Sequence, residues 1–132
     1  MKRNTVLMAL LTLLLIVWGG HAIAQTTLTP DAILGIYENE TGERQMEIFR
    51  QNNQYFGKLI SDKSDSERPL KPGTIVLKAF TFAKNEWVNG TVYTPKQGRD
   101  FKATLTMVDS QTLRINARYG LMSRSKDWKR VK

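Results

Sequence analysis

The stretch from Trp87 to Phe101 constrains the fold most, because it has the composition of two β-strands joined by a tight turn. Residues 87–94 are rich in aromatic and β-branched side chains, which suit a half-buried pleated surface. Pro95 and Gly98 fit the positions of a turn that needs a preset φ at its start and a positive φ at its end. After this turn the apolar residues alternate strictly with polar ones, which predicts a strand with one buried and one exposed face. The apolar set is Phe101, Ala103, Leu105 and Met107.

Similar short patterns recur along the chain and predict about eight strands in all. The expected strands cover residues 33–39, 44–50, 54–61, 74–82, 87–94, 99–107, 112–119 and 125–131. Most of them are separated by tight turns such as Asn52-Asn53, since asparagine tolerates a positive φ. Sequential antiparallel strands with short links favour an all-β fold, a small up-and-down antiparallel barrel of about eight strands. The alternative is a two-sheet sandwich, which needs longer crossing connections.

Three local features depart from this regular pattern. Gly57 lies inside an expected strand and predicts a bulge, a sharp bend or the close approach of another backbone. Residues 62–73 form the longest irregular stretch and predict a mobile connection, with a lid as the alternative. Thr29, Pro30 and Asp31 predict a single helical turn, with the threonine hydroxyl as its cap and proline at its first position.

The first 24 residues have the order of a secretory signal peptide. Lys2 and Arg3 precede an apolar run from Val6 to Val17, and Ala22-Ile23-Ala24 is a small-x-small cleavage site. A membrane anchor is the alternative, but a span needs about 20 apolar residues and this run is shorter. We therefore expect residues 1–24 to be removed and residues 25–132 to form one domain that is exported to the periplasm or secreted. After cleavage the protein is not expected to span a membrane.

The absence of cysteine, and of histidine after residue 24, limits the catalytic and metal sites that the chain can form. The chain has no cysteine, and its single histidine, His21, lies in the expected signal peptide. Residues 25–132 therefore cannot form Ser-His-Asp or Cys-His pairs or the usual zinc sites. The alternative is a carboxylate pair among Glu38, Glu40 and Glu43, as in glycosidases, but these acids fall on an expected solvated turn. We expect no enzyme activity, no catalytic residues, no metal site and no cofactor.

The net charge of the chain is strongly positive, and many of its basic residues lie toward the C-terminal end. The formal net charge is +8, and it falls to +6 for residues 25–132 because Lys2 and Arg3 are lost. This excess fits either a solvated face or a surface that binds an anionic component of the cell envelope. An exported protein is not expected to meet nucleic acid. The late basic residues are Arg114, Arg118, Arg124, Lys126, Lys129, Arg130 and Lys132.

Several motifs together resemble one family of exported bacterial proteins. The most specific piece is the run from Trp87 to Pro95 with Gly98 and Phe101, and weaker pieces lie across residues 34–130. They are Gly35-Ile36-Tyr37, Tyr55-Phe56-Gly57-Lys58-Leu59, Pro72-Gly73-Thr74-Ile75-Val76-Leu77 and Trp128-Lys129-Arg130. On these motifs the chain resembles the family named domain of unknown function 2147. The resemblance implies a lipocalin-like (calycin) barrel, with no known enzyme activity and no established ligand.

The resemblance also suggests how the barrel closes. Lipocalin-like barrels often begin with Gly-x-Trp and place an arginine of the last strand over the tryptophan ring. Here Tyr37 stands in the tryptophan position and Arg130 in the arginine position. We expect this pair to form a structural latch through a cation–π contact.

A barrel of this size can hold one small ligand or can be filled by its own side chains. We expect a monomer that binds a small apolar or amphipathic ligand inside the barrel. The alternative is a basic envelope-interaction module with a filled, ligand-free core. The candidate ligand-binding residues are Tyr55, Trp87, Tyr93, Phe101, Met107, Ile115 and Tyr119.

Overall fold

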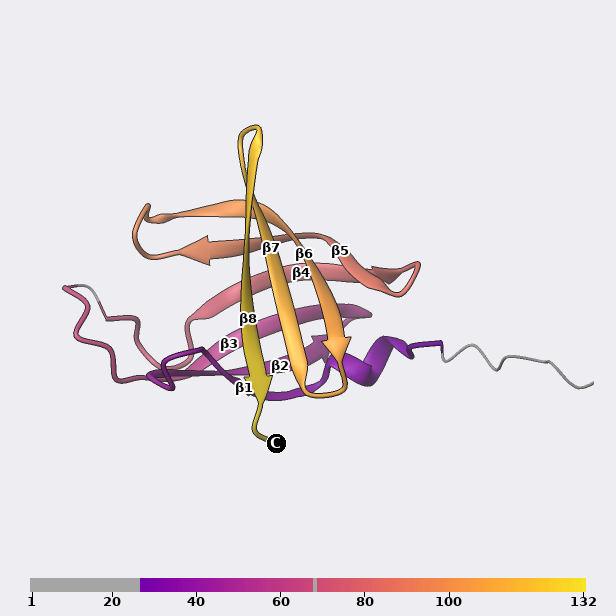
Figure 1. Cartoon of the computed structure of the whole chain (residues 1–132), viewed down its shortest axis with the longest axis horizontal. Coiled ribbons are helices and arrows are strands. Elements are labelled where there is room, and N and C mark those ends of the chain that lie inside the picture. Colours follow the sequence, from indigo (N-terminus) through magenta and orange to yellow (C-terminus); the bar gives the residue numbers. More distant parts are fainter. Residues whose placement is uncertain (1–26, 68) are drawn as a thin grey trace, which may run out of the picture.

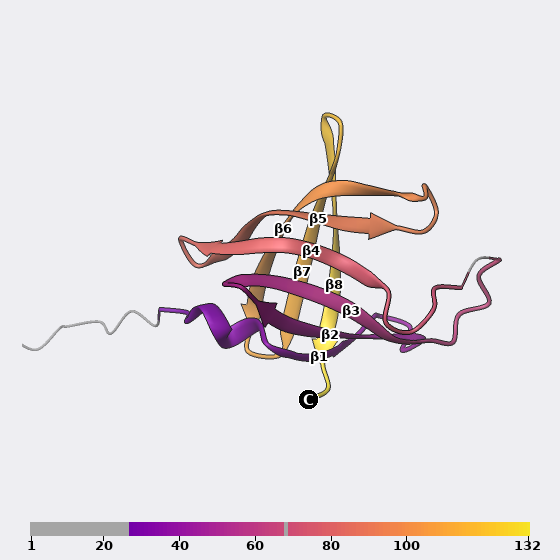
Figure 2. The same ribbon diagram turned by 180° about the vertical axis from the view of Figure 1, so that it is seen from behind.

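The strands follow one another around a closed ring (Figures 1 and 2). The computed structural model describes residues 27–67 and 69–132, and this part of the chain holds eight strands, all antiparallel to their neighbours. They are β1 (Gly35–Glu38), β2 (Arg44–Gln51), β3 (Gln54–Asp62), β4 (Ile75–Ala83), β5 (Glu86–Thr94), β6 (Arg99–Asp109), β7 (Thr112–Tyr119) and β8 (Met122–Arg130). The predicted all-β, up-and-down barrel is confirmed.

Tight turns join most neighbouring strands, as the sequence predicts. Asn52 and Asn53 adopt φ values of 52° and 60° between β2 and β3. Lys84 and Asn85 do the same between β4 and β5, with φ values of 53° and 62°. Two consecutive positive φ angles match the twist of the flanking strands, so the hairpins close without splaying. Gly98 has a φ of 66° at the end of the Pro95 turn, which confirms its predicted role.

The period-two patterns correctly predict which side chains face the interior. On β6, Phe101, Ala103 and Leu105 are buried and Met107 is half-buried. On β7, Leu113, Ile115 and Ala117 are buried in the same alternation. Alternation of this kind places every second side chain of a strand inside the barrel.

Gly57 is required by the close approach of neighbouring side chains. A Cβ at this position would lie 2.9 Å from Met46 Sδ and 3.0 Å from Leu77 Cβ. The register between β3 and β4 also shifts on both sides of Gly57. The predicted irregularity is therefore confirmed, and it is both a bulge and a close approach.

The long connection at residues 63–74 joins two adjacent strands. β3 pairs directly with β4, with Tyr55 opposite Phe80 and Gly57 opposite Leu77. The connection does not cross between two sheets, so the sandwich alternative is excluded.

The barrel closes through a short seam between its first and last strands. β1 and β8 share two register pairs, Tyr37 with Arg130 and Glu38 with Lys129. The Arg130 guanidinium lies 5.0 Å from the centre of the Tyr37 ring, which is the predicted latch. Arg130 also donates hydrogen bonds to three backbone carbonyl oxygens, those of Ala32 (2.7 Å), Leu34 (2.6 Å) and Ser110 (3.0 Å). These hydrogen bonds add to the stability of the seam, because β1 and β8 share only two register pairs.

A glycine makes room for the latch. A Cβ on Gly35 would lie 2.5 Å from Arg130 Nη1 and 2.7 Å from the carbonyl oxygen of Lys132. Any side chain there would displace the arginine. The glycine and the arginine of the predicted motif therefore depend on each other.

The predicted helical turn is present as the short 3-10 helix η2 (Pro30–Ile33), with proline at its start. The predicted cap is wrong, because the Thr29 side chain makes no capping hydrogen bond. The Asp31 carboxylate instead accepts hydrogen bonds from Tyr55 and Arg50, which fastens the helix to the barrel. The expected signal peptide, residues 1–24, lies outside the described residues.

Candidate functional site

The two ends of the barrel are built differently. An up-and-down topology places alternate connections at opposite ends. We call the end that carries η2 and the β2–β3, β4–β5 and β6–β7 turns the closed end. The other end carries the β1–β2, β3–β4, β5–β6 and β7–β8 connections, and we call it the open end.

The closed end is filled by large side chains. Tyr37, Phe80 and Trp87 are fully buried there, together with Leu105 and Leu113. The Tyr37 hydroxyl donates a hydrogen bond to the carbonyl oxygen of Ile33 at 2.8 Å. The Trp87 indole nitrogen donates to the carbonyl oxygen of Pro30 at 3.0 Å. The helix η2 thus satisfies the polar atoms of both aromatic residues and covers this end. Burial also raises the pKa of the Tyr37 hydroxyl to about 12, so it remains a donor at neutral pH.

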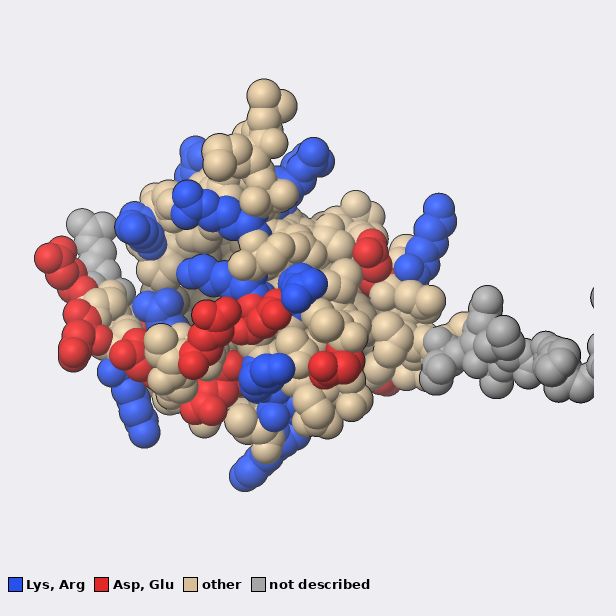
Figure 3. Space-filling view, viewed as in Figure 1, with Lys and Arg blue, Asp and Glu red and all other residues tan. Residues whose placement is uncertain are grey.

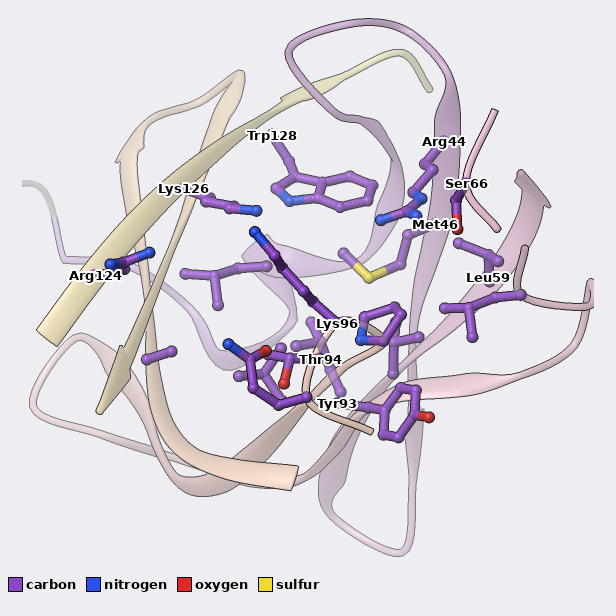
Figure 4. Close-up of a pocket in the computed structure, with 18 of the residues that line it drawn as sticks. Arg44, Met46, Leu59, Ser66, Tyr93, Thr94, Lys96, Arg124, Lys126 and Trp128 are labelled. Atoms are coloured by element: carbon purple, nitrogen blue, oxygen red, sulfur yellow. The ribbon is translucent and has the colours of Figure 1, made fainter. Parts of the chain in front are cut away.

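The open end leads into a cavity of about 750 Å³. Ligand pockets in proteins typically measure about 300–1,000 Å³, so this space suits one small molecule. Figure 4 shows the side chains that surround it. The lining residues are Arg44, Met46, Leu59, Ser66, Glu67, Leu70, Val76, Leu77, Val92, Tyr93, Thr94, Pro95, Lys96, Gln97, Ile115, Ala117, Tyr119, Arg124, Lys126 and Trp128.

The inner wall of the cavity is apolar. Met46 of β2, Leu59 of β3, Leu77 of β4 and Ile115 of β7 are buried and line it. The half-buried Trp128 of β8 adds an aromatic face. Inward positions on five strands thus form a surface suited to a hydrocarbon chain or ring.

The rim of the cavity is basic. Arg124 and Lys126 alternate with Trp128 along β8, and period two places all three on the lumen side of that strand. Lys96 reaches the same space from the β5–β6 turn, and Figure 4 shows the Lys96 and Lys126 side chains extending toward each other beside the Trp128 ring. Within residues 27–67 and 69–132, no carboxylate forms an ion pair with Lys96, Arg124 or Lys126. Three cations without counter-ions at a cavity mouth favour an anionic group.

The fourth cation of the lining, Arg44, already has a carboxylate partner. Arg44 Nε lies 3.3 Å from Asp62 Oδ2, and the Asp62 side chain is fully buried. The Ser64 and Leu70 backbone amides donate hydrogen bonds to the Asp62 carboxylate at 2.9 and 3.0 Å. Burial alone would raise the pKa of Asp62, but the hydrogen bonds from Ser64 and Leu70 and the Arg44 charge lower it to about 2.

Asp62 thereby shapes the β3–β4 connection. It holds Ser64 and Leu70, and Ser66, Glu67 and Leu70 of the connection join the lining. Whether residues 62–73 act as a mobile connection or as a lid stays a prediction.

Charge is distributed unevenly around the open end. In Figure 3 basic side chains lie above the hollow and over the upper part of the molecule, whereas acidic ones lie below the hollow and on the side of the β3–β4 connection. That connection carries Asp65 and Glu67 together with Lys63 and Lys71, and the β1–β2 turn carries Glu40 and Glu43. The cations come from the β5–β6 turn, which carries Lys96, and from β8, which carries Arg124 and Lys126. An anionic group entering the cavity would therefore be drawn to the side formed by β5, β6, β7 and β8.

The structure places three of the seven predicted ligand-binding residues in the cavity lining: Tyr93, Ile115 and Tyr119. A fourth, Phe101, lies next to the lining, with its ring centre 4.4 Å from that of Tyr119.

The other three predicted residues lie at the closed end. Tyr55 and Trp87 pack edge to face, with ring centres 6.4 Å apart. Met107 Sδ lies 3.6 Å from the Tyr37 hydroxyl oxygen. These three side chains fill the barrel rather than line the cavity, although all of them alternate inward as predicted.

Several lining residues were missed by sequence reasoning. Met46 alternates with polar neighbours, and Leu59 and Leu77 lie in apolar strand segments, so the sequence favours the interior for all three but does not show which end they face. The signal for Arg124 and Lys126 was their even spacing, four and two residues before Trp128. Sequence reasoning assigned them to an outer basic face, because charged residues seldom face a barrel interior.

The described residues contain no cluster of three or more potential metal ligands. Glu40 and Glu43 are exposed on the β1–β2 turn, and Glu38 is half-buried on β1. Across residues 27–67 and 69–132 there is also no helix with the length and apolar character needed to cross a bilayer.

Comparisons with known proteins agree with this architecture. The sequence profile of domain of unknown function 2147, described as an uncharacterized protein conserved in bacteria, matches residues 35–130. Among solved structures, the chain is similar to protein HP1028 from the human pathogen Helicobacter pylori, which belongs to the lipocalin family. The two share 20% sequence identity with a TM-score of 0.62, and the match covers 81% of this chain and 85% of that one. This similarity establishes a lipocalin-like fold. No curated protein matches the chain.

Proposed function

This chain belongs to the bacterial family of domain of unknown function 2147, and we propose that it binds one small amphipathic molecule with an acidic head group. The observation that carries the proposal is the cavity of about 750 Å³, which combines an apolar inner wall with three unpaired cations at its rim. An apolar ligand alone would not need the cations. A purely ionic ligand would not need the apolar wall.

The depth of the cavity suits the tail of such a molecule. Met46, Leu77 and Ile115 would contact the tail where water is least accessible. Each methylene group moved from water into this surface contributes about 0.8 kcal/mol. A single acyl chain or a fused ring system would gain several kcal/mol in this way.

The head group would lie among Lys96, Arg124 and Lys126. Charge-assisted hydrogen bonds between an ammonium or guanidinium group and a carboxylate or phosphate are about twice as strong as neutral ones. Binding of an anion would also relieve the mutual repulsion of the three cations. An acid is therefore preferred over a neutral or positively charged head group.

The proposal is tested with three ligands that differ only in the head group: dodecanoate, dodecanol and dodecylamine. Isothermal titration calorimetry should show that the acid binds about tenfold more tightly than the alcohol, with the amine weakest. In the double variant Lys96→Gln/Lys126→Gln the acid should lose this advantage while the affinity for the alcohol stays the same. Equal affinity for all three ligands in the parent protein would contradict the role of the cations.

Two further variants separate the cavity from the outer surface. Lys102→Gln removes an exposed cation from β6 outside the cavity lining and should leave all three affinities unchanged. Val92→Trp introduces a large ring into the lining and should weaken binding of all three ligands. If none of the ligands is sensitive to Val92→Trp, binding does not occur in the cavity.

A basic envelope-interaction module is the second candidate function. The observation in its favour is the set of basic residues on the β5–β6 turn and the open-end part of β8, which extends beyond the cavity rim to Arg99 of β6 and Arg118 of β7. Binding of an anionic polymer would depend steeply on salt and would not respond to Val92→Trp. The two candidates are thus separated by one variant and one salt series.

We further propose that the protein is exported, cleaved after Ala24 and monomeric. The support is the charge and hydropathy pattern of residues 1–24 together with a barrel that closes on itself within one chain. Mass spectrometry of protein recovered from the periplasm and the medium would identify the N-terminus. Sedimentation velocity of the same sample would give the oligomeric state.

A further inference from the structure

The β7–β8 hairpin projects well beyond the rest of the barrel in both views (Figures 1 and 2). Its turn is Gly120-Leu121, with a φ of 65° at the glycine, and Tyr119 is paired with Met122 across it. The Leu121 side chain is fully exposed and that of Met122 is 65% exposed. We call Leu121 and Met122 the hairpin tip.

The fold gives no reason for an apolar tip. A two-residue turn with glycine at its first central position accepts polar residues at the second, so leucine is not required there. Leu121 gains no burial energy within the barrel, because nothing covers it. Of the four large apolar residues that are exposed in the described part of the chain, two are these neighbours, and Val108 and Val131 are the others. Such a concentration at a protruding point indicates a contact with something outside the chain.

Cations and aromatic rings lie close to the hairpin tip, on its barrel side. Arg118 is paired with Ser123, and Arg124 with Ala117, so both arginines are within three residues of Leu121. At about 3.3 Å per residue, their Cα atoms lie about 7–10 Å below the tip. The Phe101 and Tyr119 rings pack together at this level, with Arg99 4.5 Å from the Phe101 ring centre and Arg124 6.0 Å from that of Tyr119. The hairpin carries no carboxylate between Thr112 and Lys126.

We propose that the hairpin tip enters the surface of an anionic lipid bilayer. The order of the side chains matches the order of the layers: Leu121 and Met122 at the acyl boundary, then Arg118 and Arg124 at the depth of the phosphates. Surface-binding segments bury apolar side chains about 5–10 Å into this boundary and hold cations beside the head groups. Long arginine side chains can adjust their reach to the phosphate level. Charge complementarity selects an anionic lipid as the occupant.

This inference goes beyond the proposed cavity ligand and does not depend on it. Leu121 and Met122 do not line the cavity, so a loss of vesicle binding leaves the test of the cavity unaffected. The two sites are nevertheless neighbours, because the same hairpin contributes Tyr119 and Arg124 to the lining. The contact would hold the open end close to a membrane surface.

Co-sedimentation with vesicles tests the proposal. The exported protein, with every variant in the same N-terminal form, should bind vesicles of phosphatidylcholine mixed with phosphatidylglycerol much better than vesicles of phosphatidylcholine alone. Leu121→Ser should weaken this binding by about tenfold or more, since the removed side chain is the one that becomes buried. Arg118→Gln should weaken it by about fivefold, the loss that one cation makes near such a surface, and should reduce its salt dependence. If Leu121→Ser binds as the parent does, the proposal is overturned.

Matched controls lie away from the tip. Val108→Ser removes an exposed apolar side chain from the far end of β6, and Lys84→Asn removes an exposed cation from the β4–β5 turn, where asparagine tolerates the positive φ. Both should leave vesicle binding unchanged. If they weaken it as much as the tip variants do, the whole surface is involved and the tip has no special role.

The absence of cysteine allows a direct measurement of insertion. A polarity-sensitive fluorophore on Leu121→Cys should shift its emission to the blue when phosphatidylglycerol vesicles are added, and the same fluorophore on Val108→Cys should not. A shift at position 121 that grows with protein concentration in the absence of lipid would identify the tip as a contact between two copies of the chain. That result, or no shift with vesicles, would overturn the lipid proposal.

Discussion

Residues of the same type lie in different surroundings in the two halves of this barrel. At the closed end they are packed and hydrogen-bonded, whereas toward the open end they border the cavity. Trp87 and Trp128 show the contrast most clearly. Trp87 is fully buried at the closed end and its indole nitrogen is hydrogen-bonded to η2. Trp128 is half-buried, lies opposite Leu113 in the register of β7 and β8, and borders the cavity that leads to the open end.

The arginines show the same contrast. Arg130 at the closed end packs over Tyr37 and donates to three backbone carbonyls, so its hydrogen-bonding capacity is used within the fold. Arg124 lies six residues earlier on the same face of β8 and has no carboxylate partner among the described residues. On the proposed function, one strand thus contributes to stability at one end and to ligand recognition at the other. Substitutions at the closed end should change stability, and those at the open end should change binding.

The largest expected difference is between the two tryptophans. Trp87→Ala should lower the free energy of unfolding by about 3–5 kcal/mol, because it leaves a large cavity and an unsatisfied carbonyl at Pro30. Trp128→Ala should cost less than about 1.5 kcal/mol, because that ring already borders empty space. Urea denaturation followed by circular dichroism measures both values.

Ligand binding should show the reverse order. Trp128→Ala should weaken dodecanoate binding, and a milder closed-end variant, Ile33→Val in η2, should leave it unchanged while still reducing stability. If the two tryptophan variants lose equal stability, the ends are not energetically distinct and the cavity is not preformed.

The next largest effect is the loss of folding stability expected when Asp62, the buried carboxylate of the open end, is substituted or protonated. Its pKa of about 2 in the folded state is below the ordinary value of 3.8. A lowered pKa stabilises the fold above the unfolded pKa, and this contribution disappears as the pH falls from about 4 to about 2. A shift of this size corresponds to about 2 kcal/mol at neutral pH. Asp62→Asn should therefore destabilise the protein by about that amount at pH 7, and parent and variant should converge near pH 2.

Asp100→Asn is the control for this pH series. Asp100 is an exposed partner of Lys78 on the outer surface, and its loss should cost less than about 1 kcal/mol. Thermal unfolding at several pH values would compare all three proteins. A constant difference between the parent and Asp62→Asn from pH 7 to pH 2 would show that the carboxylate charge is not what holds the β3–β4 connection.

The sequence predicts the barrel well because residues that are close together in the chain determine most of its strands and turns. Alternation in β6 and β7, paired asparagines and the Pro95–Gly98 turn each determine structure within a few residues. The strand order then follows from short links. The latch is also predictable, since the resemblance implies a glycine, an aromatic residue and an arginine at the seam, and Gly35, Tyr37 and Arg130 take these positions here.

The position of the cavity could not be predicted in the same way. Period two assigns Tyr55, Trp87 and Met107 to the interior, but distance along the barrel axis depends on strand tilt and stagger. These three residues are at the filled end, whereas Tyr93, Ile115 and Tyr119 line the space. The role of the β3–β4 connection depends on Asp62, whose hydrogen bonds to Ser64 and Leu70 are not apparent from composition.

The smallest expected effect is the coupling free energy within two arginine–aromatic pairs. It is also the sharpest test of the difference between the closed and open ends. A double-mutant cycle of Tyr37→Leu and Arg130→Met should give a coupling of about 0.5–2 kcal/mol, because that contact is 5.0 Å and partly desolvated. The matching cycle of Tyr119→Leu and Arg124→Met should give no more than about 0.5 kcal/mol, since Arg124 is exposed at 6.0 Å.

The single variant Arg130→Met should cost more than the coupling, because it also removes three hydrogen bonds to Ala32, Leu34 and Ser110 that do not involve the Tyr37 ring. Arg124→Met should have almost no effect on stability and should weaken binding of an acidic ligand. Zero coupling at Tyr37–Arg130 would leave these backbone hydrogen bonds as the whole of the latch. Equal coupling in both pairs would mean that the open end is as tightly organised as the closed one, and the division of β8 between stability and recognition would then be wrong.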